Sequence, residues 1–250
     1  MNKKLKKKTN QNNFIPPLLF FLIIVVSITF FYKKKVETNQ DKKVVQTFLS
    51  NRPANFASVG LDVSHHQGKI NWNKLFKHYR YDTLIQFVYC KATEGSNYLD
   101  QEFKYNRSEL SRLGIRNGAY HFFRFTSNPI DQAKHFLNEW NVYENDLPPV
   151  LDIEIEGPND KEFFEAIKIW LKYIENVTGR RPIIYTSKHF YETKFKTQFL
   201  DYKFWVAAYS ASSLKLDDRI IHWQYTDRAK LPGIKGKIDA NVSVLFKDDK

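Results

Sequence analysis

The chain has 250 residues, 42% of them hydrophobic and 26% charged, so it has room for one large folded domain and an appendage and is not an intrinsically disordered protein. Its formal net charge of +12 is concentrated near the N-terminus, because residues 1–43 contribute +8 and the remainder only +4. A nucleic-acid-binding protein would carry its basic charge on the folded part, so we expect no nucleic-acid partner.

An uncharged run, residues 14–32, lies between two lysine clusters near the N-terminus. It is long enough to cross a bilayer and no small-residue cleavage site follows it, so we predict one uncleaved transmembrane helix. The chain then divides into a basic N-terminal segment (1–13), the anchor (14–32), a polar tether (33–55) and a folded domain (56–250). Lysines flank both ends of the run equally, so charge alone does not predict the orientation of the anchor.

Strands and helices alternate through the first half of the folded domain. Apolar runs rich in β-branched and aromatic residues predict about eight strands, and amphipathic periodicity with capping residues predicts helices after each of the first four strands. We expect the strands at 58–63, 84–91, 118–122, 148–156, 182–186, 204–209, 220–226 and 237–239, and the helices from residue 72, at 101–113, at 128–142 and at 159–177. Cys90, the only cysteine, lies in an apolar run, which predicts a small buried side chain rather than a nucleophile.

This alternation predicts an α/β fold in which a parallel sheet of about eight strands closes into a trimmed TIM-like β/α barrel, with fewer helices in its second half. In such barrels the chemistry lies at the C-terminal ends of the strands. The acids at those ends are Asp62, Glu94, Asp152, Glu154 and Asp239. Carboxylates gathered at one mouth raise one another's pKa, which indicates an active site rather than packing.

Two of these acids stand two residues apart in the predicted strand 148–156. Because side chains alternate along a strand, Asp152 and Glu154 project to one side and the apolar residues between them to the other. Such a pair can split into a proton donor and a charged stabiliser, as glycosidic bond cleavage requires. A buried strand that becomes polar as it reaches the surface is the structural alternative. We expect a pKa raised toward neutrality for Glu154, with Asp152 remaining an acceptor.

The domain resembles glycoside hydrolase family 25, the Chalaropsis-type lysozymes (N-acetylmuramidases), over nearly its whole length from Val59 to Val244. Motifs that carry the resemblance occur in the family order. They are GLDVSHHQGKINW (Gly60–Trp72), KATEG (Lys91–Gly95), GAYHF (Gly118–Phe122), LDIE (Leu151–Glu154), WVAAY (Trp205–Tyr209), WQYT (Trp223–Thr226) and PGIKGKIDAN (Pro232–Asn241).

The resemblance implies cleavage of the β-1,4 bond between N-acetylmuramic acid and N-acetylglucosamine in peptidoglycan, without metal or cofactor. It implies that Glu154 is the general acid/base and that Asp62, Asp152 and Asp239 are the other acids of the catalytic groove. The nucleophile stays open: either the 2-acetamido group of the sugar, oriented by Asp152, or a carboxylate, and both predict net retention. We expect a monomer on the cytoplasmic membrane, with its catalytic domain on the outer face, where peptidoglycan lies.

Aromatic and polar residues at the strand ends are candidates for sugar contacts, because an aromatic face packs against a pyranose ring while its polar tip hydrogen-bonds hydroxyls. These candidates are Glu94, Tyr120, His121, Tyr185, Trp205, Tyr209, Trp223, Gln224 and Tyr225. Glu94 is alternatively a hydrogen-bond anchor for a neighbouring loop. Adjacent histidines chelate poorly, so we interpret His65–His66 as structural or as a substrate contact rather than a metal site.

Two other functions remain to be weighed. A chitinase-like hydrolase of N-acetylglucosamine polymers also uses a D-x-E on its fourth strand, but its fuller pattern needs acids where this chain has Leu147 and Val150. An inactive peptidoglycan-binding module is the other alternative. The acid cluster argues against it, because a binding module gains nothing from carboxylates that repel one another.

Overall fold

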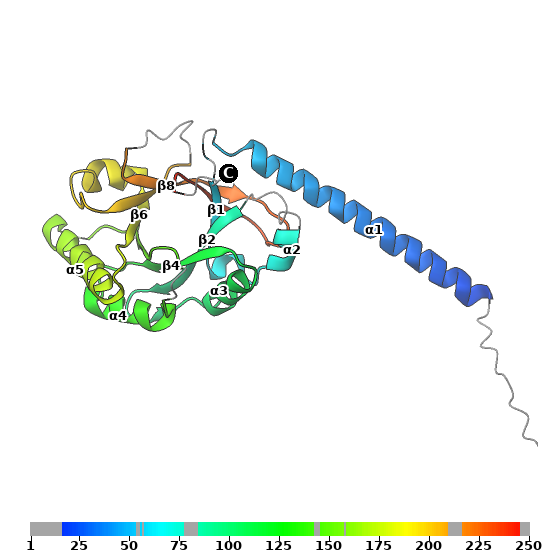
Figure 1. Ribbon diagram of the computed structural model, residues 1–250, viewed down its shortest axis with the longest axis horizontal. Coiled ribbons are helices and arrows are strands. Elements are labelled where there is room, and N and C mark those ends of the chain that lie inside the picture. The colour runs from blue at the N-terminus through cyan, green and yellow to red at the C-terminus, as the bar shows by residue number, and fades with distance from the viewer. Residues whose placement is uncertain are drawn as a thin grey trace, which may run out of the picture. The chain divides into compact units, whose positions relative to one another are not determined.

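The computed structural model describes residues 17–53, 56, 58–77, 85–142, 146–157, 159–209 and 217–245 (Figure 1). The chain separates into two compact units, Met1–Lys43 and Val44–Lys250. The second unit therefore begins twelve positions before the predicted boundary at residue 56.

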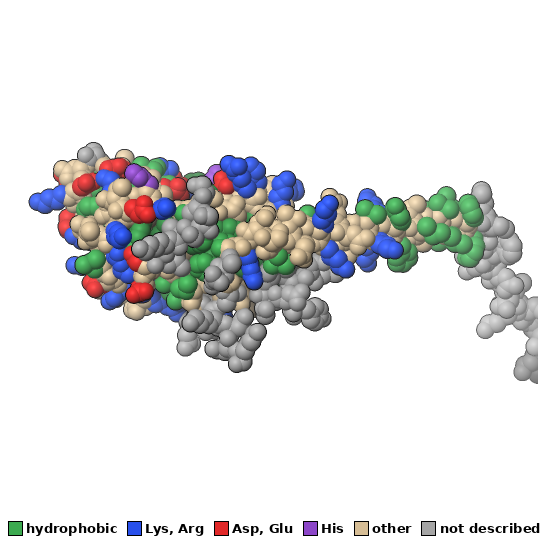
Figure 2. All heavy atoms as spheres, turned by 90° about the horizontal axis from the view of Figure 1, so that it is seen from above, with side chains coloured by type: hydrophobic (Ala, Val, Ile, Leu, Met, Phe, Trp, Pro, Cys, Tyr) green, Lys and Arg blue, Asp and Glu red, His purple; other side chains and the backbone are tan. Residues whose placement is uncertain are grey.

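A single helix, α1 (Pro17–Ser50), covers most of the N-terminal region. Its large apolar side chains between Leu19 and Tyr32 are exposed, and they are the green group at the outer end of the helix in Figure 2. No helix among the described residues is long and apolar enough to cross a membrane. The anchor predicted at 14–32 is therefore not confirmed, and its first three residues lie outside the described part of the chain.

The predicted tether, 33–55, differs from the structure because α1 continues through it to Ser50. The last turns of the helix belong to the second unit, where Phe48 is 5% exposed and packs in the main core with Val45 and Leu49 against it. The sequence analysis missed this because the apolar residues are spaced among lysines and glutamines. Residues 44–50 are thus part of the folded domain.

Nine strands form one sheet in the order β1-β9-β8-β7-β6-β5-β4-β2-β3, and pairing of β1 with β2 closes eight of them into a barrel. The predicted α/β barrel of about eight strands is thus confirmed. The strands are β1 (Ser58–Val63), β2 (Ile85–Glu94), β3 (Tyr98–Leu99), β4 (Arg116–Phe122), β5 (Val150–Ile153), β6 (Ile183–Ser187), β7 (Lys203–Ala207), β8 (Ile220–Ala229) and β9 (Ile238–Ser243). The short β3 only extends the edge of β2.

The barrel is mixed rather than fully parallel, which corrects the prediction. β9 runs antiparallel to both β1 and β8, and every other pairing within the ring is parallel. No crossover helix separates β8 from β9, so a strand that returns directly must run antiparallel. Asp239 lies near the start of β9, yet it pairs with Asp62 at the end of β1 and so reaches the predicted mouth.

The helices cover the outside of the first half of the barrel, and they end where capping residues predict (Figure 1). They are η1 (His65–Gln67), α2 (Trp72–Lys77), α3 (Phe103–Arg112), α4 (Pro129–Trp140), α5 (Asp160–Thr178), α6 (Lys188–Phe190) and η2 (Tyr191–Phe195). Asn128 and Asn159 accept backbone N–H bonds at the starts of α4 and α5, and Gly179 ends α5 in the left-handed conformation. After α5 only short helical turns occur in the described residues, as predicted for a trimmed barrel.

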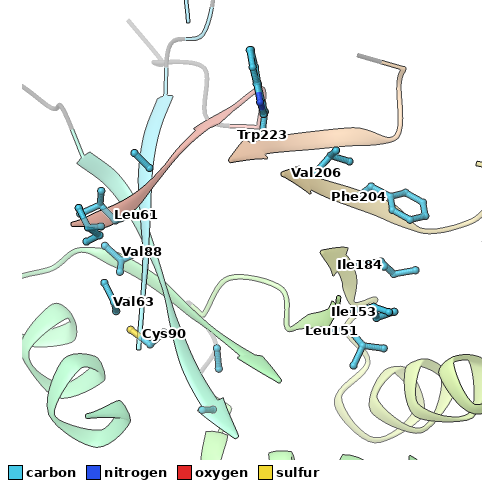
Figure 3. Packing of buried hydrophobic residues seen from close by; sticks show 14 of the residues in the cluster. Leu61, Val63, Val88, Cys90, Leu151, Ile153, Ile184, Phe204, Val206 and Trp223 are labelled. Carbon is cyan, nitrogen blue, oxygen red and sulfur yellow. The ribbon is translucent and has the colours of Figure 1, made fainter. Parts of the chain in front are cut away.

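The core has two layers because side chains alternate across the barrel wall. Leu61, Val88, Ile153 and other outward-facing residues pack beneath the helices (Figure 3). The inner layer holds large aromatic side chains, among them Phe87 and Tyr89. A Cβ at Gly60 would lie 2.2 Å from the Phe87 ring, so glycine leaves the space that this ring fills. These inner side chains fill the base of the barrel, and a pocket remains at its other end.

Candidate active site

A pocket of about 190 Å³ opens at the ends of the barrel strands, and we call it the mouth pocket. Its walls come from both halves of the barrel, and polar side chains predominate among them. The lining residues are Asp62, Ser64, His66, Gln67, Lys91, Tyr120, Phe122, Val150, Asp152, Glu154, Tyr185, Trp205, Tyr209, Gln224 and Asp239. The structure therefore brings together all four predicted catalytic acids, together with five of the nine predicted substrate contacts: Tyr120, Tyr185, Trp205, Tyr209 and Gln224.

Asp62 and Asp239 form the first acid pair of the mouth pocket. Asp62 accepts N–H bonds from Gln224 Nε2 at 3.0 and 2.9 Å and from Asn241 Nδ2 at 2.6 Å. Burial raises the pKa of Asp62 to about 6 against the effect of these donors. Burial and the Asp62 charge raise the pKa of Asp239 to about 8. Asp239 therefore holds the shared proton and Asp62 ionises first.

Three aromatic side chains fix the amides that support Asp62. Tyr185 and Tyr209 donate their hydroxyls to Gln224 Oε1 at 2.8 and 2.6 Å. Trp205 Nε1 donates to Asn241 Oδ1 at 2.8 Å. Because each amide oxygen is occupied as an acceptor, each amide nitrogen must point its hydrogens at the Asp62 carboxylate. The predicted aromatic platforms thus also orient the supports of the first acid pair.

Asp152 and Glu154 form the second pair, at the end of β5. Asp152 is 5% exposed, and its Oδ1 has no hydrogen-bond partner among the described residues. Burial, and then the neighbouring Glu154 charge, raise the pKa of Asp152 well above its ordinary value. Burial also raises the pKa of Glu154, against a hydrogen bond from Asp152 and the charges of Lys91 and Arg124. The expectation of a raised pKa for Glu154 is met, and the pKa of Asp152 is raised as well, which the sequence did not predict.

Four predicted substrate contacts lie outside the mouth pocket, Glu94 and three that are buried within the fold. His121 is fully buried, bonded to Thr93 and Gln132 and stacked on a tryptophan of α5, while Trp223 and Tyr225 belong to the outer core layer. The physical reason is strand alternation, since each of the three adjoins a residue that does face the pocket. The sequence analysis predicts consecutive residues of one strand to be substrate contacts, although only every second side chain of a strand can face the pocket.

Glu94 is an anchor rather than a residue of the mouth pocket. It bridges Lys91 and Arg124, and the pKa of Glu94 is lowered because hydrogen bonds from these two cations outweigh the opposing effect of burial. Lys91 itself lines the mouth pocket, and the sequence analysis did not select it, although it opens the KATEG motif. The available signal was a lysine at the end of a predicted apolar strand, three residues before Glu94.

The loop after β1 supplies further pocket residues that were not predicted. Ser64 and Gln67 form a reciprocal capping box around η1, which places His66 at the pocket wall. His65 instead turns to Asp100, with Nδ1 2.8 Å from Oδ2. Within the described ranges, no group of three or more histidine, cysteine or acidic side chains is arranged to hold a metal. His65 thus has a structural contact with Asp100, and His66 stays a candidate substrate contact at the pocket wall.

A β/α barrel with acid pairs at the ends of its strands defines a glycoside hydrolase. Residues 61–234 match the family model described as "Glycosyl hydrolases family 25", and this chain belongs to that family. It is therefore a glycoside hydrolase of the lysozyme family.

Similar proteins and solved structures also support membership of this family. The chain is 36% identical over 200 residues to the Escherichia coli (strain K12) protein YegX, covering 79% of this chain and 74% of the relative. It is 32% identical over 209 residues to "Lysozyme M1" of Streptomyces globisporus, covering 76% and 69%. A family 25 glycosyl hydrolase structure from Bacillus anthracis superposes with a TM-score of 0.71 at 28% identity, covering 80% of this chain and 94% of the other.

Proposed function

We propose that this enzyme cleaves the β-1,4 bond between N-acetylmuramic acid and N-acetylglucosamine in peptidoglycan, with net retention at the anomeric carbon. The observation that carries the proposal is the Asp152–Glu154 pair, two acids at the end of β5 that both line the mouth pocket of a family 25 barrel. The printed name of the similar Streptomyces protein, a lysozyme, supports the substrate class.

Glu154 is the proton donor to the leaving oxygen. Its carboxyl lies at the open end of the mouth pocket, where a substrate can reach it, and burial raises its pKa above the ordinary value, as a proton donor requires. After the bond breaks, the same carboxylate takes a proton from the incoming water, as microscopic reversibility requires. Glu154 thus serves as acid and then as base.

Asp152 positions the attacking group. Its buried Oδ1 has no donor within the described part of the chain, so a 2-acetamido N–H of the sugar supplies one. The acetamido oxygen is then turned toward the anomeric carbon, and the positive charge that develops on the acetamido group is stabilised by its N–H hydrogen bond to Asp152. Attack by the acetamido oxygen predicts net retention, whereas direct attack by an activated water would predict inversion.

Mass spectrometry of muropeptides released from purified sacculi tests the proposal. The expected products have N-acetylmuramic acid at the reducing end, which borohydride reduction marks. Products ending in reducing N-acetylglucosamine would contradict the assigned bond. Faster release from chitin oligosaccharides than from sacculi would favour the chitinase-like alternative, and binding without release would favour an inactive module.

The location of the enzyme belongs to the same proposal. Peptidoglycan lies outside the cytoplasmic membrane, so the domain acts on the outer face, with residues 14–32 as a single-pass anchor. The uncharged run between lysine clusters and the exposed apolar side chains of Leu19–Tyr32 support an anchor. A mature N-terminus beyond Tyr32, or release of the protein by alkaline carbonate, would contradict the anchor.

A further inference from the structure

A second depression of about 390 Å³ adjoins the mouth pocket, and we call it the Arg124 pocket. Its wall includes Lys91, Glu94, Tyr98 and Arg124. Lys91 and His66 line both pockets, so a sugar held in the mouth pocket can extend a substituent into the Arg124 pocket.

The Arg124 pocket carries more positive than negative charge. Glu94 Oε2 accepts a hydrogen bond from Lys91 Nζ at 2.5 Å, and Glu94 Oε1 accepts from Arg124 Nε at 2.8 Å and Nη2 at 2.5 Å. One carboxylate thus serves two cations. The nearby Asp100 carboxylate is fully buried and directed at His65, so it does not neutralise the surplus at the pocket surface.

Packing holds the guanidinium of Arg124 in place. Both cations contact the Phe122 ring, with Lys91 Nζ 4.9 Å and Arg124 Cζ 4.7 Å from its centroid. The Arg124 side chain remains 40% exposed, and its Nη1 has no hydrogen bond within the described residues. A fixed, partly exposed guanidinium with unused donors is suited to a carboxylate, because little side-chain entropy remains to be lost on binding.

We propose that the Arg124 pocket binds a carboxylate carried by the muramic acid residue beside the cleaved bond, with Arg124 as the specificity-determining residue. This inference rests on the proposed function. The carboxylate has two possible sources, the lactyl group where no peptide is attached or the peptide stem where one is. An uncharged N-acetylglucosamine polymer offers neither, so the pocket would select peptidoglycan over chitin.

The test compares Arg124→Gln with Arg181→Gln on three substrates. Arg181 is a matched control, because it pairs with Glu175 at 2.8 Å and stacks on Tyr202 but lines neither pocket. The substrates are stem-bearing glycan strands, strands trimmed to the lactyl carboxylate, and stem-bearing strands whose carboxylates have been amidated with carbodiimide. We expect Arg124→Gln to raise KM about tenfold on one or both acidic substrates, with kcat little changed, and to have no effect on amidated strands.

Each outcome decides between the possibilities. A penalty confined to trimmed strands assigns the lactyl carboxylate, and one confined to stem-bearing strands assigns the stem. Equal KM values for both variants, or an equal loss on amidated strands, would overturn the inference. If Arg124→Gln does not fold, the wild-type enzyme still gives the answer, because only acidic strands should lose kcat/KM as salt is raised. Failure of the wild type to cleave any strand would instead refute the proposed function.

Discussion

The two acid pairs of the mouth pocket differ in how much of their environment the protein supplies. Asp62 accepts three N–H bonds from the side-chain amides of Gln224 and Asn241. The oxygens of these amides in turn accept hydrogen bonds from aromatic side chains. Asp152 is equally buried, yet its Oδ1 has no donor in the described chain. A buried acceptor without a donor is costly, so it indicates a place that a substrate completes. We therefore call Asp62 and Asp239 the scaffold pair, and we call Asp152 and Glu154, to which the proposed chemistry is assigned, the reactive pair.

The largest expected effect comes from the reactive pair. Glu154→Gln keeps the shape of the side chain but removes the transferable proton, so we expect kcat to fall at least about a hundredfold. Reducing-end release from sacculi measures the rate, and a pull-down with sacculi measures binding, which should persist. Glu165→Gln, an exposed change on α5, is the control and should retain full activity. Near-normal turnover by Glu154→Gln would mean that the acid is misassigned.

Asp152→Asn sharpens the comparison, because it changes the partner of Glu154 and leaves the pocket shape intact. An amide cannot carry the negative charge that a carboxylate places beside the acetamido group as positive charge develops there, so we expect kcat to fall at least about tenfold. The pKa of Glu154 should also change, since Asp152 is one of its hydrogen-bond partners. The pH–rate profile measures that change, and an unshifted acidic limb together with unchanged kcat would contradict the assigned contact.

For the scaffold pair we expect a loss of stability first. Asp62→Asn sets a new NH₂ group against the NH₂ groups of Gln224 and Asn241, which leaves buried donors unpaired. The free energy of unfolding should fall by about 1–3 kcal/mol, and Tm by about 2–4 °C for each kcal/mol. Thermal unfolding followed by circular dichroism measures the change, with the exposed Asp201→Asn as control. Equal Tm values would show that the amide network does not stabilise the fold.

The raised pKa values of the scaffold pair also predict a pH dependence of stability. Asp239 has a folded pKa of about 8 against an ordinary 3.8, so the folded state binds the extra proton and stability falls as pH rises toward 8. His121 and His222, buried with pKa values lowered to about 3, act oppositely but only below about pH 6.5. Between pH 6.5 and 8 we therefore expect the free energy of unfolding to fall by about 1 kcal/mol.

Urea unfolding at both pH values measures this difference. The variant Asp239→Asn removes the titrating group, so its stability should change less across the same interval. A wild-type protein that becomes more stable from pH 6.5 to pH 8 would contradict the assignment of the shared proton to Asp239.

The smallest expected effect is a difference in KM between variants of Tyr209 and Tyr225, both of which the sequence predicted to be substrate contacts. Tyr209 lines the mouth pocket and donates to Gln224, whereas the Tyr225 hydroxyl faces the outer core layer and has no partner among the described residues. Tyr209→Phe should raise KM several-fold, by roughly the strength of one neutral hydrogen bond. Tyr225→Phe should leave KM unchanged. Steady-state kinetics measure both, and equal effects would mean that the two faces of β8 are misassigned.

Much of the fold follows from local signals in the sequence. Asn128, Asn159 and Gly179 set the ends of α4 and α5 through backbone hydrogen bonds that those residue types make wherever they occur. The positions of Asp62, Asp152 and Glu154 at the mouth could be predicted because each stands at the end of an apolar strand. The direction of β9 could not, since Asp239 looks the same in sequence whether the strand rises toward the mouth or leaves it.

The remaining differences concern contacts between distant parts of the chain. Phe48 joins the core, and nothing in the local sequence indicates what it packs against. The Glu94 interaction with Arg124 spans 30 residues, so the anchoring role of Glu94 appears only when β2 and β4 are paired. The errors at His121, Trp223 and Tyr225 were avoidable, because strand alternation alone separates them from Tyr120 and Gln224.

The product anomer tests the central claim most directly, because it reports what the Asp152–Glu154 pair does to the bond. Proton NMR of a short peptidoglycan oligomer, recorded before mutarotation, identifies the anomer that forms first. Attack by the acetamido oxygen, with Asp152 orienting it and Glu154 as the acid, predicts that the β-anomer of N-acetylmuramic acid forms first. An α-anomer formed first would mean that a carboxylate activates water directly, and that Asp152 and Glu154 do not act as a retaining pair.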